Sequence, residues 1–314
     1  MDLDDCEALF ADIRSVVDQD LLVQIFGQLL KEYEILNCTL GPGSIFWRGR
    51  RSGSGGFNNL SDLSYPPAAL CKTGRLNDQL EPVFYAAARE TTVLSELHVS
   101  PGDYVHLIGY RISSDETLHL ASFGEYLSIQ RTGLSRLIQS DPCKSITKLL
   151  NSYENGKSLL LIFIDAFLAE ILSDVSANQQ GYRRTRALKN AVLRQMPDID
   201  GLFYPSVRDN MGLNLALWSG SFDRTMEPVC SQVLRIQKAR DYSVFDYDRC
   251  RHAIGIDENG NFLMQSPDSD ASHIIFAKTP QELSNIEQGL CELGHKSDGI
   301  VRYYKLSSTA KLGS

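Results

Sequence analysis

The sequence has no paired cysteines. Its seven cysteines stand singly, and no two of them form a Cys-x-x-Cys pair. An odd number of scattered cysteines is typical of reduced thiols in a cytosolic protein, and it argues against a disulfide framework or a zinc site. The seven are Cys6, Cys38, Cys71, Cys143, Cys230, Cys250 and Cys291.

Long apolar runs are also missing, and we expect no export signal. The most hydrophobic run, Leu159 to Ile164, is followed by Asp165 and Glu170, well before the roughly 18 to 20 apolar residues that a membrane span requires. We therefore predict a buried helix there and no membrane association. The first residues, Met-Asp-Leu-Asp-Asp, lack the basic region of a signal peptide. We expect the protein to act in the cytosol, either of the producing cell or of a target cell.

Basic residues are fewer than acidic residues. The chain has 39 acidic and 31 basic residues and a formal net charge of -8, so attraction to nucleic acid or to an anionic membrane is not expected as its main activity. A basic group, Arg183, Arg184 and Arg186, has the spacing of a solvated helix face. We therefore predict no nucleic-acid partner.

Familiar catalytic signatures are absent as well. The six histidines do not have metal-ligand spacing, so we expect no metal. Ser206 follows Tyr204-Pro205 but lacks the Gly-x-Ser-x-Gly elbow around it, so a serine hydrolase nucleophile is not expected.

What is present fits a globular protein of mixed α and β structure. With 314 residues, 43% of them hydrophobic, the chain can form one large domain or two smaller ones. Apolar residues at helical spacing from Leu3 to Leu36 predict a helical pair that is broken near Asp18 to Asp20. This segment is interpreted as a packing extension, with a partner-binding arm as the alternative.

The rest of the chain alternates between strand and helix patterns. Strands are predicted at residues 44–48, 83–86, 104–108, 201–204 and 213–218, with a loop at 51–66. Helices are predicted at residues 90–97, 134–150, 159–172 and 182–196. After residue 224 we predict short strands at 233–236, 253–256 and 273–277, then a helix to about Leu293 that starts from the capping box at Thr279.

Five polar residues stand at the ends of predicted elements or in turns, where ligands are commonly bound. A guanidinium can hold a phosphate in a planar fork, an aromatic ring can stack on a heterocycle, and a carboxylate in an apolar helix faces water or a cleft. Each residue alone also has an ordinary structural interpretation. The five are Arg48, Arg75, Tyr85, Glu96 and Ser206.

Taken together, these residues resemble the core of RES-domain proteins, a family named for arginine, glutamate and serine. The resemblance lies in Phe46-Trp47-Arg48, Gly74-Arg75-Leu76-Asn77, Pro82 to Ala86 with Glu96, Gly201 to Ser206, and Gly212 to Leu215. It covers roughly Ser44 to Phe222. Two departures are Leu76, where an aromatic residue is common in the family, and the wide separation of Glu96 from Ser206, which indicates an insertion around residues 113–180.

The resemblance implies an α+β fold with an ADP-ribosyltransferase-like core of small mixed or antiparallel sheets surrounded by helices. We place this core at residues 41–225. A helical N-terminal extension would occupy residues 1–40, and an α/β C-terminal extension would occupy residues 226–314.

The resemblance also implies chemistry on NAD, because family members act as toxins that destroy NAD or transfer ADP-ribose. Glu96 would stabilise the positive charge that develops on the ribose as nicotinamide leaves. Arg48 and Arg75 would hold the diphosphate, and Tyr85 would stack near the nicotinamide. Ser206 would orient the nicotinamide ribose or the amide. The catalytic residues would then be Arg48, Arg75, Glu96 and Ser206, and the NAD-binding residues Arg48, Arg75, Asn77, Tyr85, Ser206 and Asn214.

The sequence leaves the acceptor open. Water would make the protein an NAD glycohydrolase, inorganic phosphate a phosphorylase, and a protein side chain an ADP-ribosyltransferase. A non-catalytic nucleotide-binding or interaction module is the remaining alternative. A toxin of this kind is expected to need a neutralising antitoxin or immunity protein, and no cofactor is expected other than NAD as the substrate.

Overall fold

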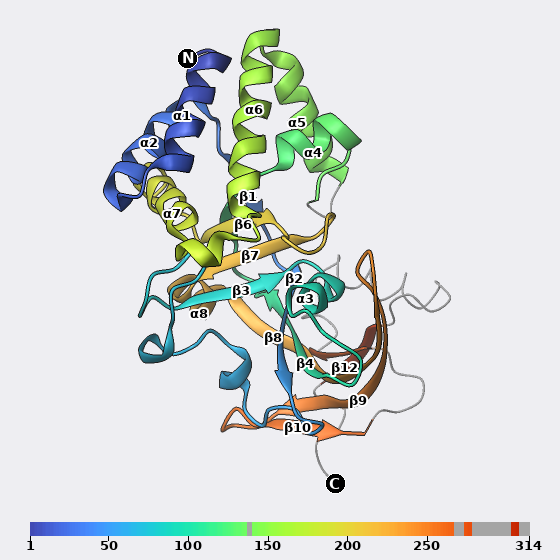
Figure 1. The fold of residues 1–314 in the computed structure, drawn as a ribbon. Helices are drawn as coiled ribbons and strands as arrows, with labels where there is room; N and C mark the ends of the chain where they lie inside the picture. Colours follow the sequence, from blue (N-terminus) through green and yellow to red (C-terminus); the bar gives the residue numbers. More distant parts are fainter. Residues whose placement is uncertain (137–139, 267–272, 278–302, 308–314) are drawn as a thin grey trace. The chain divides into compact units, whose positions relative to one another are not determined.

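The computed structural model describes residues 1–136, 140–266, 273–277 and 303–307, and the chain divides into two compact units (Figure 1). The first unit consists of Met1–Cys38, Pro67–Val83 and His119–Leu217. The second consists of Thr39–Pro66, Phe84–Leu118 and Trp218–Ser314. Both units are therefore built from segments that are far apart in the sequence.

The predicted N-terminal helical pair is confirmed in the first unit. Helix α1 spans Leu3–Ser15 and starts at a capping box formed by Asp2. Helix α2 spans Gln19–Glu32, and the Asp18 side chain caps it by accepting the N–H of Leu21 at 2.8 Å. The helical prediction fails near its end, because Leu36–Leu40 form strand β1.

Three further predicted helices of the first unit are also found. They are α5 (Ser140–Ser152), α6 (Asn155–Leu172) and α7 (Arg183–Gln195). Two short elements were not predicted, namely helix α4 (Glu125–Thr132) and the 3-10 turn η3 (Ala177–Gln180).

Asp165, an acidic residue in the apolar helix α6, has a structural role. Asp165 is fully buried and accepts hydrogen bonds from the N–H groups of Gly124 and Leu127, at 2.7 and 2.9 Å, and from the Tyr33 hydroxyl at 2.6 Å. It therefore caps α4 from a neighbouring helix.

The strands of the first unit follow the order β1-β5-β6-β7. Strand β5 (Leu118–Ser122) runs parallel to β6 (Gly201–Pro205), and β7 (Leu213–Trp218) runs antiparallel to β6. A Cβ atom at Gly201 would lie 2.1 Å from the carbonyl oxygen of Ala216, so only glycine fits at the start of β6. The predicted strands at 201–204 and 213–218 are confirmed.

The second unit contains strands in the order β3-β2-β4-β8-β9-β10. Each neighbouring pair in this set is antiparallel. The strands are β2 (Ile45–Ser52), β3 (Val83–Ala87), β4 (Tyr104–Ile112), β8 (Met226–Arg240), β9 (Val244–Ile256) and β10 (Phe262–Gln265). The helices of this unit are α3 (Glu90–Glu96) and α8 (Ser219–Thr225), and it also contains the 3-10 turn η1 (Leu60–Leu63). A further 3-10 turn, η2 (Ala68–Leu70), belongs to the first unit.

Several predictions for this unit need correction. The small sheets and short C-terminal strands that we predicted are in fact one larger antiparallel array, in which β8 has 15 residues and β9 has 13. Strand β2 continues to Ser52, beyond the predicted end at Arg48. The predicted strand at 273–277 is confirmed as β11 (His273–Ala277), which pairs in parallel with β12 (Tyr303–Ser307). The helix predicted after Thr279 lies outside the described residues.

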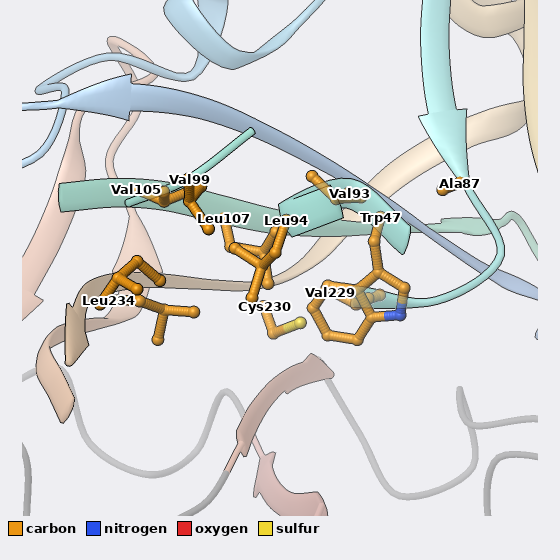
Figure 2. Close-up of a cluster of buried hydrophobic side chains, with 11 residues drawn as sticks. Trp47, Ala87, Val93, Leu94, Val99, Val105, Leu107, Val229, Cys230 and Leu234 are labelled. Atoms are coloured by element: carbon orange, nitrogen blue, oxygen red, sulfur yellow. The ribbon is translucent and has the colours of Figure 1, made fainter. Parts of the chain in front are cut away.

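A hydrophobic cluster fixes α3 on the strands of the second unit (Figure 2). A Cβ atom at Gly49 would lie 2.7 Å from Cγ1 of Val93, so this glycine allows α3 to pack closely against β2. The cluster consists of Trp47, Ala87, Val93, Leu94, Val99, Val105, Leu107, Val229, Cys230, Leu234 and Ile236.

Candidate functional site

The predicted site residues are distributed over both units. The second unit carries Arg48 on β2, Tyr85 on β3 and Glu96 at the end of α3. The first unit carries the remaining four, which are Arg75, Asn77, Ser206 and Asn214.

Arg48 lies in the middle of β2, where its side chain is held by two neighbours. Its Nη1 donates a 2.8 Å hydrogen bond to the carbonyl oxygen of Tyr85, and its guanidinium lies over the ring of Phe84, 5.4 Å from the centroid. Burial lowers the pKa of Arg48 to about 10, so the side chain remains a cation at neutral pH. Its Nε atom is also buried and has no hydrogen-bond partner.

No carboxylate neutralises Arg48 within the described part of the chain. The ionisable groups that act on its pKa are Tyr110, Arg50 and Tyr85, and none of them is an acid that is charged at neutral pH. A charge that is partly removed from water and has no ionic partner is costly. A guanidinium in this situation is well suited to bind the anionic part of a ligand.

Arg48 and α3 occupy opposite faces of the strands. Successive side chains of a strand point to opposite faces, and on β2 Trp47 and Gly49 face Val93 of α3. Arg48 therefore points away from α3, toward the face that carries the Phe84 ring. Glu96 is half-buried at the last position of α3. The structure thus brings Arg48 to the backbone of Tyr85 but not to the face that α3 covers.

A second carboxylate of α3, Glu90, was not predicted as part of a site. Burial raises its pKa to about 8, and the positive charge of Arg249 opposes this shift only in part. Gln232 links the two, because its Nε2 lies 3.5 Å from Oε1 of Glu90 and its Oε1 accepts a 2.7 Å bond from Nε of Arg249. Glu90 is three and four residues before Val93 and Leu94, so helical spacing alone would have placed it on the core face.

Arg75 contacts the end of α6 in the first unit. Its Nη1 donates to the carbonyl oxygen of Leu172 at 2.8 Å, and Nη1 and Nη2 both donate to that of Asp174 at 3.2 Å. A cation bound to the last carbonyls of a helix is favourable, because the helix dipole places negative charge there.

Asn77 stabilises the turn that follows Gly74. Its Nδ2 donates to the carbonyl oxygens of Lys72 and Asp78, both at 2.8 Å, and the Gly74 N–H donates to the Asn77 carbonyl at 3.0 Å. The turn interpretation of this segment is therefore observed, while its predicted contact with NAD remains a prediction.

Ser206 begins the loop between β6 and β7. Its Oγ accepts the N–H groups of Arg208 and Asp209, each at 3.1 Å, and its own N–H donates to the carbonyl of Gly212 at 2.9 Å. Asn214 lies opposite Tyr204 in the β6–β7 register, and both Ser206 and Asn214 are buried. Both polar residues therefore belong to the hairpin that β6 and β7 form in the first unit.

The sequence model of the RES domain matches residues 45–239, well over half of the chain. The chain belongs to the RES domain family. Every predicted site residue lies inside the RES match, which also extends past the predicted limit at Phe222 into β8.

The RES chain is similar to a chain in the crystal structure of the M. tuberculosis MbcT–MbcA toxin–antitoxin complex, with 12% sequence identity and a TM-score of 0.33. That alignment covers 69% of this chain and 92% of the other. A comparison with curated proteins found no match.

The arginine cluster at the start of α7 is not the solvated face that we predicted. All three arginines are half-buried. Arg184 donates from Nε to the carbonyl oxygen of Ile13 at 3.2 Å, and Arg186 forms an ion pair with Asp78. Arg184 and Arg186 therefore contact α1 and the turn at Asp78, which belong to the same unit as α7.

No helix in the described part of the chain is both long and apolar enough to cross a bilayer. In the same part of the RES chain, no three His, Cys, Asp or Glu side chains gather in a way that could hold a metal ion.

Proposed function

We propose that this RES protein is a toxin that cleaves the bond between nicotinamide and ribose in NAD and so depletes cytosolic NAD. Family membership supports the proposal, and the observation that carries it is the state of Arg48. This half-buried cation has a backbone carbonyl and an aromatic ring as neighbours, and it lacks a carboxylate among the described residues. The diphosphate of NAD would supply the missing negative charge.

The reaction requires little from the protein beyond binding and electrostatic stabilisation. Nicotinamide departs as a neutral group and takes the electrons of the C–N bond, which leaves an oxocarbenium-like ribose. A carboxylate near this ribose lowers the barrier by stabilising the developing charge. We assign this role to Glu96, on the basis of the family resemblance. No metal is needed for this step.

The other roles follow from the same resemblance. Tyr85 is proposed to stack near the nicotinamide, Arg75 to bind the diphosphate together with Arg48, and Ser206 to orient the nicotinamide ribose or the amide. Asn77 and Asn214 complete the proposed NAD-binding set.

The acceptor determines the name of the enzyme. Attack by water releases ADP-ribose, attack by inorganic phosphate gives ADP-ribose 1-phosphate, and attack by a protein side chain gives an ADP-ribosylated protein. We propose the glycohydrolase or phosphorylase outcome, neutralised by an antitoxin or immunity protein. Modification of a target protein is the alternative.

Titration calorimetry with NAD tests the role of Arg48 directly, provided that every protein compared also carries Glu96→Gln, so that NAD is not consumed during the titration. The wild-type protein should bind NAD, and Arg48→Met should weaken binding by roughly tenfold or more, as expected for the loss of a charge-assisted contact to phosphate. Arg194→Met is the control, because Arg194 is exposed at the end of α7 in the first unit. Equal affinity of Arg48→Met and wild type would remove the basis of the proposal.

A further inference from the structure

A row of four side chains crosses the second unit on the face that carries Arg48. Arg50 on β2 is opposite His106 on β4, His106 is opposite Val233 on β8, and Val233 is opposite Arg251 on β9. Directly opposed residues of antiparallel strands share a face, and Arg50 is two residues from Arg48. The row therefore has an arginine at each end and lies on the Arg48 side of the strands.

A glycine-rich segment, residues 53–56, lies directly on this row. Gly56 has a φ of +77°, and a Cβ atom there would lie 2.6 Å from Cγ2 of Val233 and 2.8 Å from Nδ1 of His106. A larger residue would lift the segment from the strands. The next residue, Phe57, donates its N–H to Nδ1 of His106 at 2.9 Å, and the two rings stack with centroids 6.1 Å apart.

The two arginines hold the segment at its sides. Arg251 donates from Nη1 to the carbonyl oxygen of Gly55 at 3.3 Å and from Nη2 to that of Met264 at 3.4 Å. Arg50 donates to the carbonyl of Asp62 and lies 4.6 Å from the centroid of Phe57. Within the part of the chain that the structure describes, neither arginine contacts a carboxylate, so both charges remain unneutralised.

His106, which lies between the two arginines, is uncharged at neutral pH. Nδ1 accepts the N–H of Phe57, so the ring carries its proton on Nε2, which donates to Oγ of Ser231 at 2.7 Å. Burial, and after it the charge of Arg251, lowers the pKa of His106 to about 4. A neutral, fully buried imidazole therefore supports the segment between two cations.

The segment also presents backbone donors. Ser54 and Gly55 are exposed, and their N–H groups have no acceptor among the described residues. The carbonyl oxygen of Gly55 is next to the Arg251 guanidinium, so these N–H groups and a cation lie along one short stretch of chain. Adjacent backbone N–H groups combined with arginine form a common arrangement for phosphate oxygens.

We propose that Arg251, Arg50 and the segment 53–56 form a second site that binds a phosphate group. The ligand class is a phosphate monoester, such as a nucleoside monophosphate, or free inorganic phosphate. The N–H groups of Ser54 and Gly55 would bind two of its oxygens, and Arg251 would neutralise its charge. The site does not include Arg48, and it does not depend on NAD being the substrate.

NMR titrations in the absence of NAD test this site on the full chain. Inorganic phosphate and AMP are the two probes, and either one should shift the amide signals of Ser54, Gly55 and Gly56. Phosphate alone would identify the free ion as the ligand, and AMP binding would identify a monoester. Arg251→Gln should weaken binding by roughly tenfold, as expected for a lost charge-assisted contact, and Arg194→Gln should not.

Arg50→Gln provides a second test, because Arg50 is exposed and its replacement leaves the core intact. It should also weaken phosphate binding, by a smaller factor than Arg251→Gln. The proposal is overturned if neither probe shifts the three amides, or if both variants bind phosphate like the wild type. It is also overturned if a single-stranded oligonucleotide binds over tenfold more tightly than AMP, since an extended nucleic-acid surface would then replace the compact site.

Discussion

The Nη1 atom of Arg48 lies 2.8 Å from the carbonyl oxygen of Tyr85, and this backbone oxygen is the hydrogen-bond acceptor of the guanidinium within the described chain. A carbonyl satisfies one donor of an arginine but does not neutralise its charge. The contact links β2 to β3 and leaves the cation to be compensated by a ligand.

Arg48→Met should stabilise the folded protein while it weakens NAD binding. Methionine keeps the apolar contact with Phe84 and removes a desolvated charge, so we expect the free energy of unfolding to rise by about 1 kcal/mol. Urea denaturation of the two proteins without NAD measures the difference. A clear loss of stability would mean that Arg48 is a structural residue and that its charge is already compensated.

Gly49→Ala should destabilise the packing of α3. The new methyl group would lie 2.7 Å from Cγ1 of Val93, and overpacking of this kind costs about 1 to 3 kcal/mol. The double variant with Val93→Ala should recover part of the loss, because the smaller side chain makes room. Gly41→Ala is the control, since nothing lies within 4 Å of a Cβ atom there. Equal stability of Gly49→Ala and wild type in thermal denaturation would argue against the close contact.

Glu90 should make the protein less stable as the pH rises. Its pKa is raised from 4.5 to about 8 in the folded state, so the folded chain retains a proton that the unfolded chain has already lost. The resulting contribution to the free energy of unfolding declines from about pH 4.5 to about pH 8 and is constant above that range.

Glu90→Gln removes this titration while it keeps the shape of the side chain. The variant should be more stable than the wild type at pH 8, and the difference should shrink toward pH 4.5. Urea denaturation at several pH values gives the comparison. A difference that does not depend on pH would show that Glu90 is not protonated in the folded protein.

Helices of the first unit were predictable because local signals determine them. Apolar residues at helical spacing and the break near Asp18 to Asp20 identified α1 and α2, and the sequence also indicated that α6 is buried despite Asp165. The partners of Asp165 could not be predicted, because Tyr33, Gly124 and Leu127 are far from it in the chain and meet it only through packing.

The strands of the second unit show where local reasoning fails. Only residues 233–236 of β8 were predicted. The residues from Gln237 to Arg240 are exposed and mostly polar, and pairing with β9 extends the strand through them. The motif order gave the family and the identity of Arg48, Tyr85 and Glu96. It could not show that Arg48 and α3 are on opposite faces, because that depends on the close approach of α3 at Gly49.

Glu96→Gln separates catalysis from binding. The amide keeps the size of the side chain and removes the charge, so NAD affinity should stay close to the wild-type value. Turnover should fall by about 2 to 4 kcal/mol of transition-state stabilisation. Glu90→Gln, the same change on the same helix, is the control and should retain most of the turnover. Steady-state release of nicotinamide measures both variants, and wild-type turnover of Glu96→Gln would refute the assigned role.

The most direct measurement is the mass of the products formed when the purified protein is incubated with NAD, with and without inorganic phosphate. We predict free nicotinamide in equimolar amount with ADP-ribose, or with ADP-ribose 1-phosphate when phosphate is the acceptor. Nicotinamide release accompanied by labelled protein alone would favour the ADP-ribosyltransferase alternative. Intact NAD under all conditions would contradict the central claim and leave a binding module that retains the RES fold.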